Sequence, residues 1–152
     1  MFSGCKSLTS IDLSVIDVSN VVTMRDMFSQ TGLETIDTSG WNTSSLERCW
    51  AFVRDCPNLA SADLSGLDTR KVHYNPYYVD TTGNNWTNTI AILINCPKLT
   101  TFSIGANFQK ANSEHESLKP LQVDGNWKDS SGTVFTASTI PLGKAERYTK
   151  VS

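Results

Sequence analysis

The chain has 152 residues, of which 39% are hydrophobic and 18% are charged. This length suits one domain with a sizeable core or one repeat array, and it excludes two full enzyme domains. Thirteen Lys and Arg against fifteen Asp and Glu leave a net charge of −2, too balanced for the basic surface of a nucleic-acid-binding protein. No apolar run reaches about 18 residues, so we expect no membrane-spanning segment.

A repeated segment organises the first two thirds of the chain. Its copies lie at 7–21, 32–46 and 58–72, and a degenerate copy begins at 98. The leucines that lead the copies are 25, 26 and 40 residues apart, so the last interval equals one repeat of 26 plus an insertion of 14. A second column of apolar pairs has spacings of 26, 25 and 40: Met1-Phe2, Met27-Phe28, Phe52-Val53 and Ile92-Leu93. Two columns that agree on one insertion establish the register.

Each repeat contains a stretch of alternating residues followed by a return segment. Alternation such as Ile11-Asp12-Leu13 predicts a strand with one buried face, and strands one repeat apart must run parallel. Val21, Met24, Met27 and Phe28 have the spacing i, i+3, i+6 and i+7, which predicts a short helix or 3₁₀ turn on the convex side. Short polar residues precede these return segments as predicted Asx turns or helix caps: Asp17, Asn42 and Asp68.

The segment MFSGCKSLTSIDLS and the later pattern D-x-S-x-V-x-x-M-x-x-MF resemble the BspA-like leucine-rich repeat family. The resemblance covers residues 1–105. It implies an α/β leucine-rich repeat solenoid, with a parallel concave sheet of about four strands and short helical or 3₁₀ convex turns. The family is a surface-protein repeat of gut and oral bacteria and of mycoplasma lipoproteins, so the resemblance also implies an extracellular or cell-surface location and, in some members, an adhesin.

Two parts of the chain follow from this register. Residues 1–105 are the predicted repeat array, with the insertion within 72–86, and residues 106–152 are a predicted C-terminal capping segment. Asp-Gly, Ser-Gly and Leu-Gly turn signals in that segment predict a small β-hairpin or meander, with Trp127 and Phe135 packed against the last repeat.

Exposed positions supply the candidate binding residues. Asp12, Asp37 and Asp63 are predicted to form a ladder on the concave face, either as a solvated polar face or as a site for a cation or a basic partner. The insertion contributes three tyrosines that serve as contact residues or fold back over a flank, and Trp50 is a further exposed aromatic candidate. The three tyrosines are Tyr74, Tyr77 and Tyr78.

The four cysteines fall into the repeat columns. Cys5, Cys56 and Cys96 share one column, and Cys49 falls in the column of Met24. We expect free thiols that fill the interior, although a bridge between Cys56 and Cys96 in neighbouring repeats is sterically conceivable.

No catalytic or metal-binding motif accompanies the two histidines, so we expect no enzyme activity, cofactor or metal. The predicted function is a non-catalytic cell-surface module for protein–protein contact or for adhesion to host cells or other cells. The alternative is a structural spacer or shield without a ligand, and a weaker one is cation or glycan binding. The N-terminal residues lack the pattern of an export signal, so we expect any such signal to lie upstream. Because the sequence starts inside a repeat, we expect either further repeats upstream or end-to-end pairing of two chains.

Overall fold

The computed structural model describes residues 1–73, 91–109 and 120–152. Within these residues the chain is all-β, with nine strands and no helix, and therefore with no helix that could cross a membrane. The strands are β1 (Thr35–Asp37), β2 (Val53–Arg54), β3 (Ser61–Leu64), β4 (Leu93–Ile94), β5 (Thr101–Ile104), β6 (Leu121–Gln122), β7 (Asn126–Lys128), β8 (Val134–Thr136) and β9 (Glu146–Lys150).

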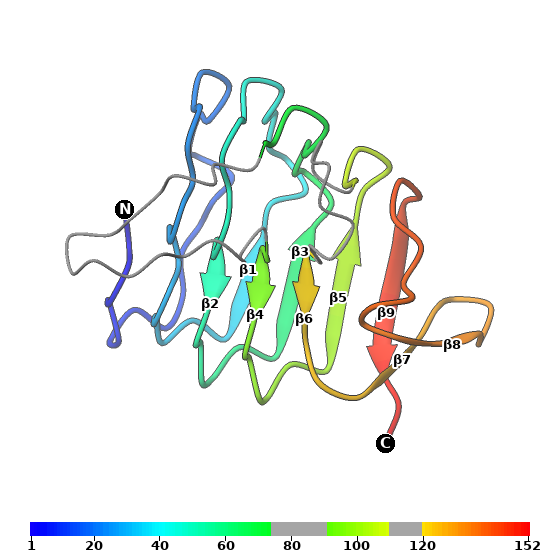
Figure 1. The fold of residues 1–152 in the computed structure, drawn as a ribbon. Helices are drawn as coiled ribbons and strands as arrows, with labels where there is room; N and C mark the ends of the chain where they lie inside the picture. The colour runs from blue at the N-terminus through cyan, green and yellow to red at the C-terminus, as the bar shows by residue number, and fades with distance from the viewer. Residues whose placement is uncertain (74–90, 110–119) are drawn as a thin grey trace, which may run out of the picture.

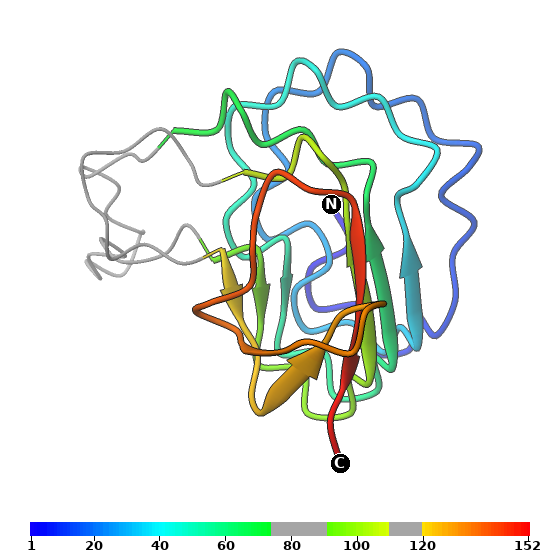
Figure 2. The same ribbon diagram turned by 90° about the vertical axis from the view of Figure 1, so that its right-hand side faces the viewer.

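The strands form two sheets that enclose the core. A six-stranded sheet has the order β1-β3-β5-β9-β7-β8, and a three-stranded parallel sheet has the order β2-β4-β6. From β1 to β6 the chain alternates between the two sheets, so each passage through both makes one coil (Figures 1 and 2). We call residues 5–30, 31–55, 56–95 and 96–122 coils 1 to 4.

The repeat register read from the sequence is confirmed by the strand pairing. Ile36 pairs with Ala62 and Ala62 pairs with Phe102, which are the expected offsets of 26 and 40 residues. Val53 pairs with Leu93 in the other sheet, again 40 residues apart. The insertion of 14 residues in coil 3 therefore does not change the strand register of either sheet.

The predicted α/β solenoid with helical or 3₁₀ convex turns is wrong, since the described chain is all-β. In the return segment, the amides of Met24, Asp26 and Phe28 donate to carbonyls of the next coil at 2.8–3.2 Å. An amide that bonds to the next coil cannot also close the i to i−4 bond of a helix. Asp26 and Ala51 have φ of 51° and 50°, left-handed corners that interrupt a right-handed helix.

The parallel sheet of about four strands is also replaced by a mixed one. Only β1, β3 and β5 run parallel, and β9, β7 and β8 continue the sheet in antiparallel pairing. Residues 120–152 thus contribute one strand to the three-stranded sheet and three to the six-stranded sheet. They extend both sheets.

The core lies between the sheets and is built from the inward columns of the coils. Phe28 stacks on Phe2 with ring centroids 5.5 Å apart and meets Phe52 edge-on at 5.3 Å. Trp41 is buried, and its indole nitrogen donates to the Leu13 carbonyl of coil 1 at 2.9 Å. These contacts tie coil 1 to coil 2.

At the other end of the molecule Trp127 closes the core. It is fully buried and meets Phe102 of coil 4 with ring centroids 4.8 Å apart, as the sequence predicted. Phe135 packs edge-on against Tyr148 at 6.1 Å, and Tyr148 stacks on Phe102 at 5.2 Å. Phe135 thus reaches the last repeat through Tyr148.

Candidate functional site

The outward side chains of the six-stranded sheet form a polar face. The register places Asp37, Asp63 and Ser103 in one row across β1, β3 and β5, and Arg147 of β9 lies opposite Ser103. A second row contains Thr35, Ser61, Thr101, Thr149 and Lys128. Side chains alternate across a strand, so both rows point away from the buried residues between them.

Coil 1 contributes a third aspartate beside the two of the first row. Glu34 donates its amide to the Thr9 carbonyl, as Ala60 does to Glu34 one coil later. This bond sets the start of coil 1 beside coil 2, but Asp12 lies in no strand and does not pair with β1. Asp12 and Asp37 both line the recess between the two coils, so the three predicted aspartates lie on neighbouring coils.

Each of the three aspartates closes a turn. Asp12 Oδ1 accepts the amide and hydroxyl of Ser14, and Asp37 Oδ1 accepts the amide of Ser39 at 2.9 Å. These hydrogen bonds from serine lower the pKa of Asp12 and of Asp37 below the ordinary value of 3.8. Within the described residues no hydrogen bond ends on Oδ2 of either carboxylate, so that oxygen is available to solvent or to a partner.

The charge of the face changes sign across the sheet. The acidic row lies over coils 1 to 3, while Arg147 and Lys128 are exposed on β9 and β7. Sequence reasoning missed these two basic residues because it treated 106–152 as a separate cap. The alternation in Glu146–Lys150, with Tyr148 buried between Arg147 and Thr149, is the signal that could have found β9.

A broad recess of about 620 Å³ lies at the acidic end, between coils 1 and 2. Its lining includes Asp12, Asp37 and several serines, with Ile11 and Trp41 beneath. Polar groups at the rim and apolar groups below give a surface that a side chain of a partner can enter.

Trp50 lies away from this face. It is half-buried in the segment that leads into β2, and the Arg25 guanidinium lies 4.0 Å from the centre of its ring. Arg25 also contacts Asp26 at 3.2 Å, and Asp26 contacts Arg54 at 3.5 Å. Trp50 is therefore part of a charged cluster beside the three-stranded sheet. Tyr74, Tyr77 and Tyr78 lie outside the described residues.

The described part of the chain holds no group of three or more His, Cys, Asp or Glu residues that could bind a metal ion. His73 is exposed, and its ring contacts the Lys71 carbonyl at 3.4 Å.

Comparison with known proteins places the chain in a family. Residues 1–89, more than half of the chain, match the family described as "Mycoplasma protein of unknown function, DUF285". The chain belongs to the DUF285 family. No curated protein and no solved structure matches this DUF285 chain.

The family match corrects the assignment made from the sequence. The predicted membership of the BspA-like leucine-rich repeat family is wrong, because the matching family is DUF285. The leucine-rich repeat and adhesin assignments came with that resemblance and have no support. The spaced pattern that suggested them belongs to coils whose return segments contain no helix within residues 1–73, 91–109 and 120–152.

Proposed function

We propose that this DUF285 chain is a non-catalytic protein-binding module that contacts its partner through the polar face of the six-stranded sheet. The observation that carries the proposal is the set of aspartates at one end of the face, with Arg147 and Lys128 at the other. Asp37 and Asp63 are paired in the sheet, and Asp12 lines the same recess as Asp37. A partner with the complementary distribution, basic over coils 1 to 3, would be oriented as well as attracted.

The composition of the face sets the kind of binding. Its rows consist of Ser, Thr, Asp and basic residues, without the Trp and Tyr anchors that dominate tight interfaces. We expect a wet contact of modest affinity that weakens as salt is added. The high content of Ser, Thr, Asn and Asp supports a location outside the cell. The tyrosines of the insertion remain a separate prediction of a contact surface.

A lysine–serine peptide of alternating sequence is a suitable probe, with binding measured by fluorescence anisotropy at two salt concentrations. The face variant replaces three carboxylates with amides: Asp12→Asn, Asp37→Asn and Asp63→Asn. The matched control changes three carboxylates that also close Asx turns but lie outside the row: Asp17→Asn, Asp68→Asn and Asp129→Asn.

We expect the face variant to bind at least about tenfold more weakly than the wild type, a change of about 1.4 kcal/mol. The control should bind more tightly than the face variant. Equal weakening in both variants would show that only the net charge matters and would contradict the proposal.

Calorimetry with Ca²⁺ alone tests the weaker alternative, cation binding. A heat of binding that is present in the wild type and absent in the face variant would assign the aspartates to a cation site.

A second candidate is a structural spacer whose copies stack end to end. The observation in its favour is the outer edge of coil 1, where Met1, Val15 and Val22 are 86%, 78% and 43% exposed. Beside them lies a small apolar recess of about 120 Å³ whose lining includes Met1, Ile16 and Val21. We propose that a second copy covers this edge, since unpaired strand groups and apolar side chains favour pairing.

Sedimentation velocity over a concentration series tests the stacking. The wild type should associate, and a Val15→Asp, Val22→Asp variant should remain monomeric. A Val134→Asp variant, which changes an exposed valine on β8 at the far end of the sheet, tests whether any added carboxylate prevents association. A monomeric wild type at all concentrations would contradict the spacer model.

A further inference from the structure

One column of the coils contains three of the four cysteines. Cys5, Thr31, Cys56 and Cys96 begin coils 1 to 4, at spacings of 26, 25 and 40 residues. They lie at the corner where the chain passes from the three-stranded to the six-stranded sheet. Cys56 and Cys96 are consecutive in this column, whereas Thr31 stands between Cys5 and Cys56.

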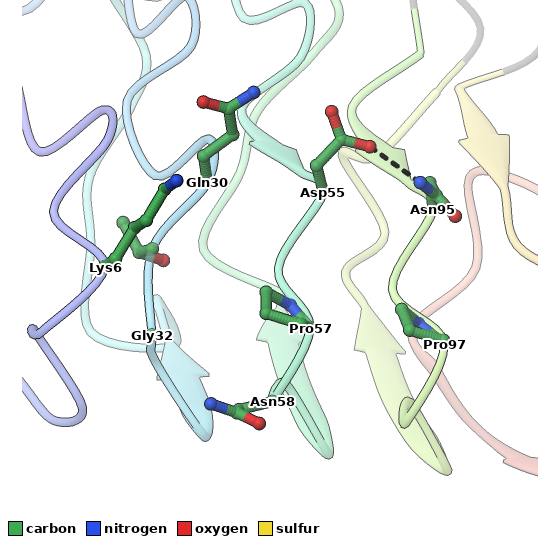
Figure 3. A pocket seen from close by; sticks show the side chains of 9 residues that line it. Lys6, Gln30, Gly32, Asp55, Pro57, Asn58, Asn95 and Pro97 are labelled. Atoms are coloured by element: carbon green, nitrogen blue, oxygen red, sulfur yellow. Dashed lines mark hydrogen bonds between the residues drawn. The ribbon is translucent and has the colours of Figure 1, made fainter.

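Strand pairing on both sides of this corner fixes how Cys56 and Cys96 lie. Two residues before them Arg54 pairs with Ile94, and five residues after them Ser61 pairs with Thr101. Both pairings have the offset of 40 residues that separates the cysteines. Between them Asn95 donates to Asp55 Oδ1 at 2.7 Å, so the register holds through the corner (Figure 3).

Side chains in this column point toward one another inside the molecule. Cys56 and Cys96 are both buried, and the Thr31 hydroxyl lies 3.4 Å from Cys56 Sγ. The neighbouring Cys96 side chain lowers the pKa of Cys56, so the two thiols lie close together. A disulfide needs Cα atoms 4.4–6.8 Å apart, and neighbours in a parallel sheet are about 4.8 Å apart. A bridge therefore requires little movement of the main chain.

All four cysteines are free in the structure. We propose that Cys56 and Cys96 are a modification site, at which a low-molecular-weight disulfide oxidises the pair to a disulfide that joins coils 3 and 4. One thiol of the pair loses its proton and attacks a sulfur of the small disulfide, which releases one small thiolate and leaves a mixed disulfide. The second cysteine, as thiolate, then attacks the protein sulfur of that mixed disulfide and releases the other small thiolate. The two small thiolates take up the two protons, so two protein thiols are oxidised and one small disulfide is reduced.

A recess gives the oxidant its approach. It has a volume of about 520 Å³, and residues on both sides of each cysteine line it: Asp55, Pro57, Asn95 and Pro97 (Figure 3). Cys96, which lies between the lining residues Asn95 and Pro97, is itself 6% exposed. Access to Cys56 follows from the mixed disulfide on Cys96, because the final step is internal to the pair.

The other two cysteines serve as internal controls. Cys49 is fully buried with 0% exposure, so a small disulfide does not reach it and it should remain a free thiol. Cys5 is exposed but has Thr31 as its neighbour in the column, so it should stop at the mixed disulfide. Only the Cys56–Cys96 pair combines access with a partner thiol.

The bridge would close a loop of the chain that includes the whole insertion. Residues 57–95 lie between the two cysteines, and the 14 extra residues of coil 3 are among them. A cross-link across a loop of this length reduces the conformational freedom of the unfolded chain, so the oxidised protein should melt at a higher temperature. Binding through the polar sheet face does not depend on this bridge.

The test is peptide mapping of the full chain after incubation with oxidised glutathione, followed by blocking of free thiols and digestion with trypsin. The sequence separates the cysteines into four tryptic peptides: 1–6, 49–54, 55–70 and 72–98. We expect peptide 55–70 to be linked to peptide 72–98, with 49–54 blocked as a free thiol and 1–6 carrying glutathione. Recovery of 55–70 and 72–98 as blocked free thiols, or linked to other peptides, would overturn the proposal.

Thermal melting provides a second readout. Oxidation should raise the Tm of the wild type and of a Cys49→Ala variant, and dithiothreitol should reverse the rise. A Cys96→Ala variant should show no rise. If that variant does not fold, the peptide map of the wild type decides the question alone.

Discussion

Buried threonine hydroxyls join neighbouring coils by hydrogen bonds to backbone groups of the next coil. Thr43 donates its hydroxyl to the Gly66 carbonyl at 2.9 Å and accepts the Asp68 amide at 2.7 Å. Thr69 makes the corresponding pair of bonds to Gln109 one coil later. Thr38, in the column of Leu13 and Leu64, is likewise buried and donates to the Asp63 carbonyl.

Thr43→Val keeps the shape of the side chain and removes both hydrogen bonds. The Gly66 carbonyl and the Asp68 amide then lose a buried partner, and we expect the free energy of unfolding to fall by about 1–3 kcal/mol. Urea denaturation measures the change. Thr35→Val, on the exposed face of β1, is the control and should change stability by less than about 0.5 kcal/mol. Equal effects at the two positions would show that the Thr43 bonds contribute nothing.

The Asx turns should make the free energy of unfolding depend on pH in the acidic range. Hydrogen bonds from Ser14 and from Ser39 lower the pKa of Asp12 and Asp37 in the folded chain below 3.8. A carboxylate with a lowered folded pKa stabilises the protein above its unfolded pKa, and that stabilisation is lost as pH falls through the folded pKa. We expect the urea midpoint to decrease below pH 3.8, and to decrease less steeply in an Asp12→Asn, Asp37→Asn variant. The same pH dependence in both proteins would be evidence against these turns.

At the scale of the elements, the coils approach one another so closely that some positions admit only glycine. A Cβ atom at Gly66 would collide with the Thr38 carbonyl oxygen and would contact Trp41 Cβ at 3.2 Å. At Gly40 a Cβ would meet nothing within 4 Å. We expect Gly66→Ala to destabilise the fold by about 1–3 kcal/mol and Gly40→Ala to change it by less than about 0.5 kcal/mol. Thermal denaturation of the two variants compares them directly, and a tolerated Gly66→Ala would mean that coils 2 and 3 are farther apart.

The elements also show where sequence reasoning succeeds and where it fails. The columns of Leu33 and Phe52 gave the correct register because burial of one residue per coil repeats with the coil. The spacing of Met24 and Met27 predicted a helix, but an extended segment with left-handed corners also buries residues at such intervals. The two structures differ in their backbone hydrogen bonds, whose partners lie in another coil. Residue spacing within one segment cannot reveal those partners.

Only part of the candidate site could be predicted from the sequence. Asp12, Asp37 and Asp63 could be placed on neighbouring coils, since all three occupy the same position of the repeat. Arg147 and Lys128 could not, because their position depends on β9 pairing antiparallel with β5, which no repeat encodes. The candidate tyrosines of the insertion remain a prediction.

For the whole molecule, the continuous six-stranded sheet unites the coils with the C-terminal residues. β9 pairs with β5 of coil 4 on one side and with β7 on the other. The inward side chain of β9, Tyr148, is buried against Phe102 of β5. This pairing brings the acidic and basic ends of the polar face onto one surface. The proposed orientation of a binding partner therefore depends on it.

Hydrogen–deuterium exchange of the full chain tests this continuity most directly. Amides of β5 and β9 are central in the sheet, and we expect them to exchange together and more slowly than those of residues 9–13, which lie outside the sheet. Slow exchange of Phe102 and Tyr148 at matching rates would support one sheet that carries both charged ends. Rapid exchange throughout 146–150, with β5 still protected, would contradict it, because the C-terminal strands would then not be part of the sheet.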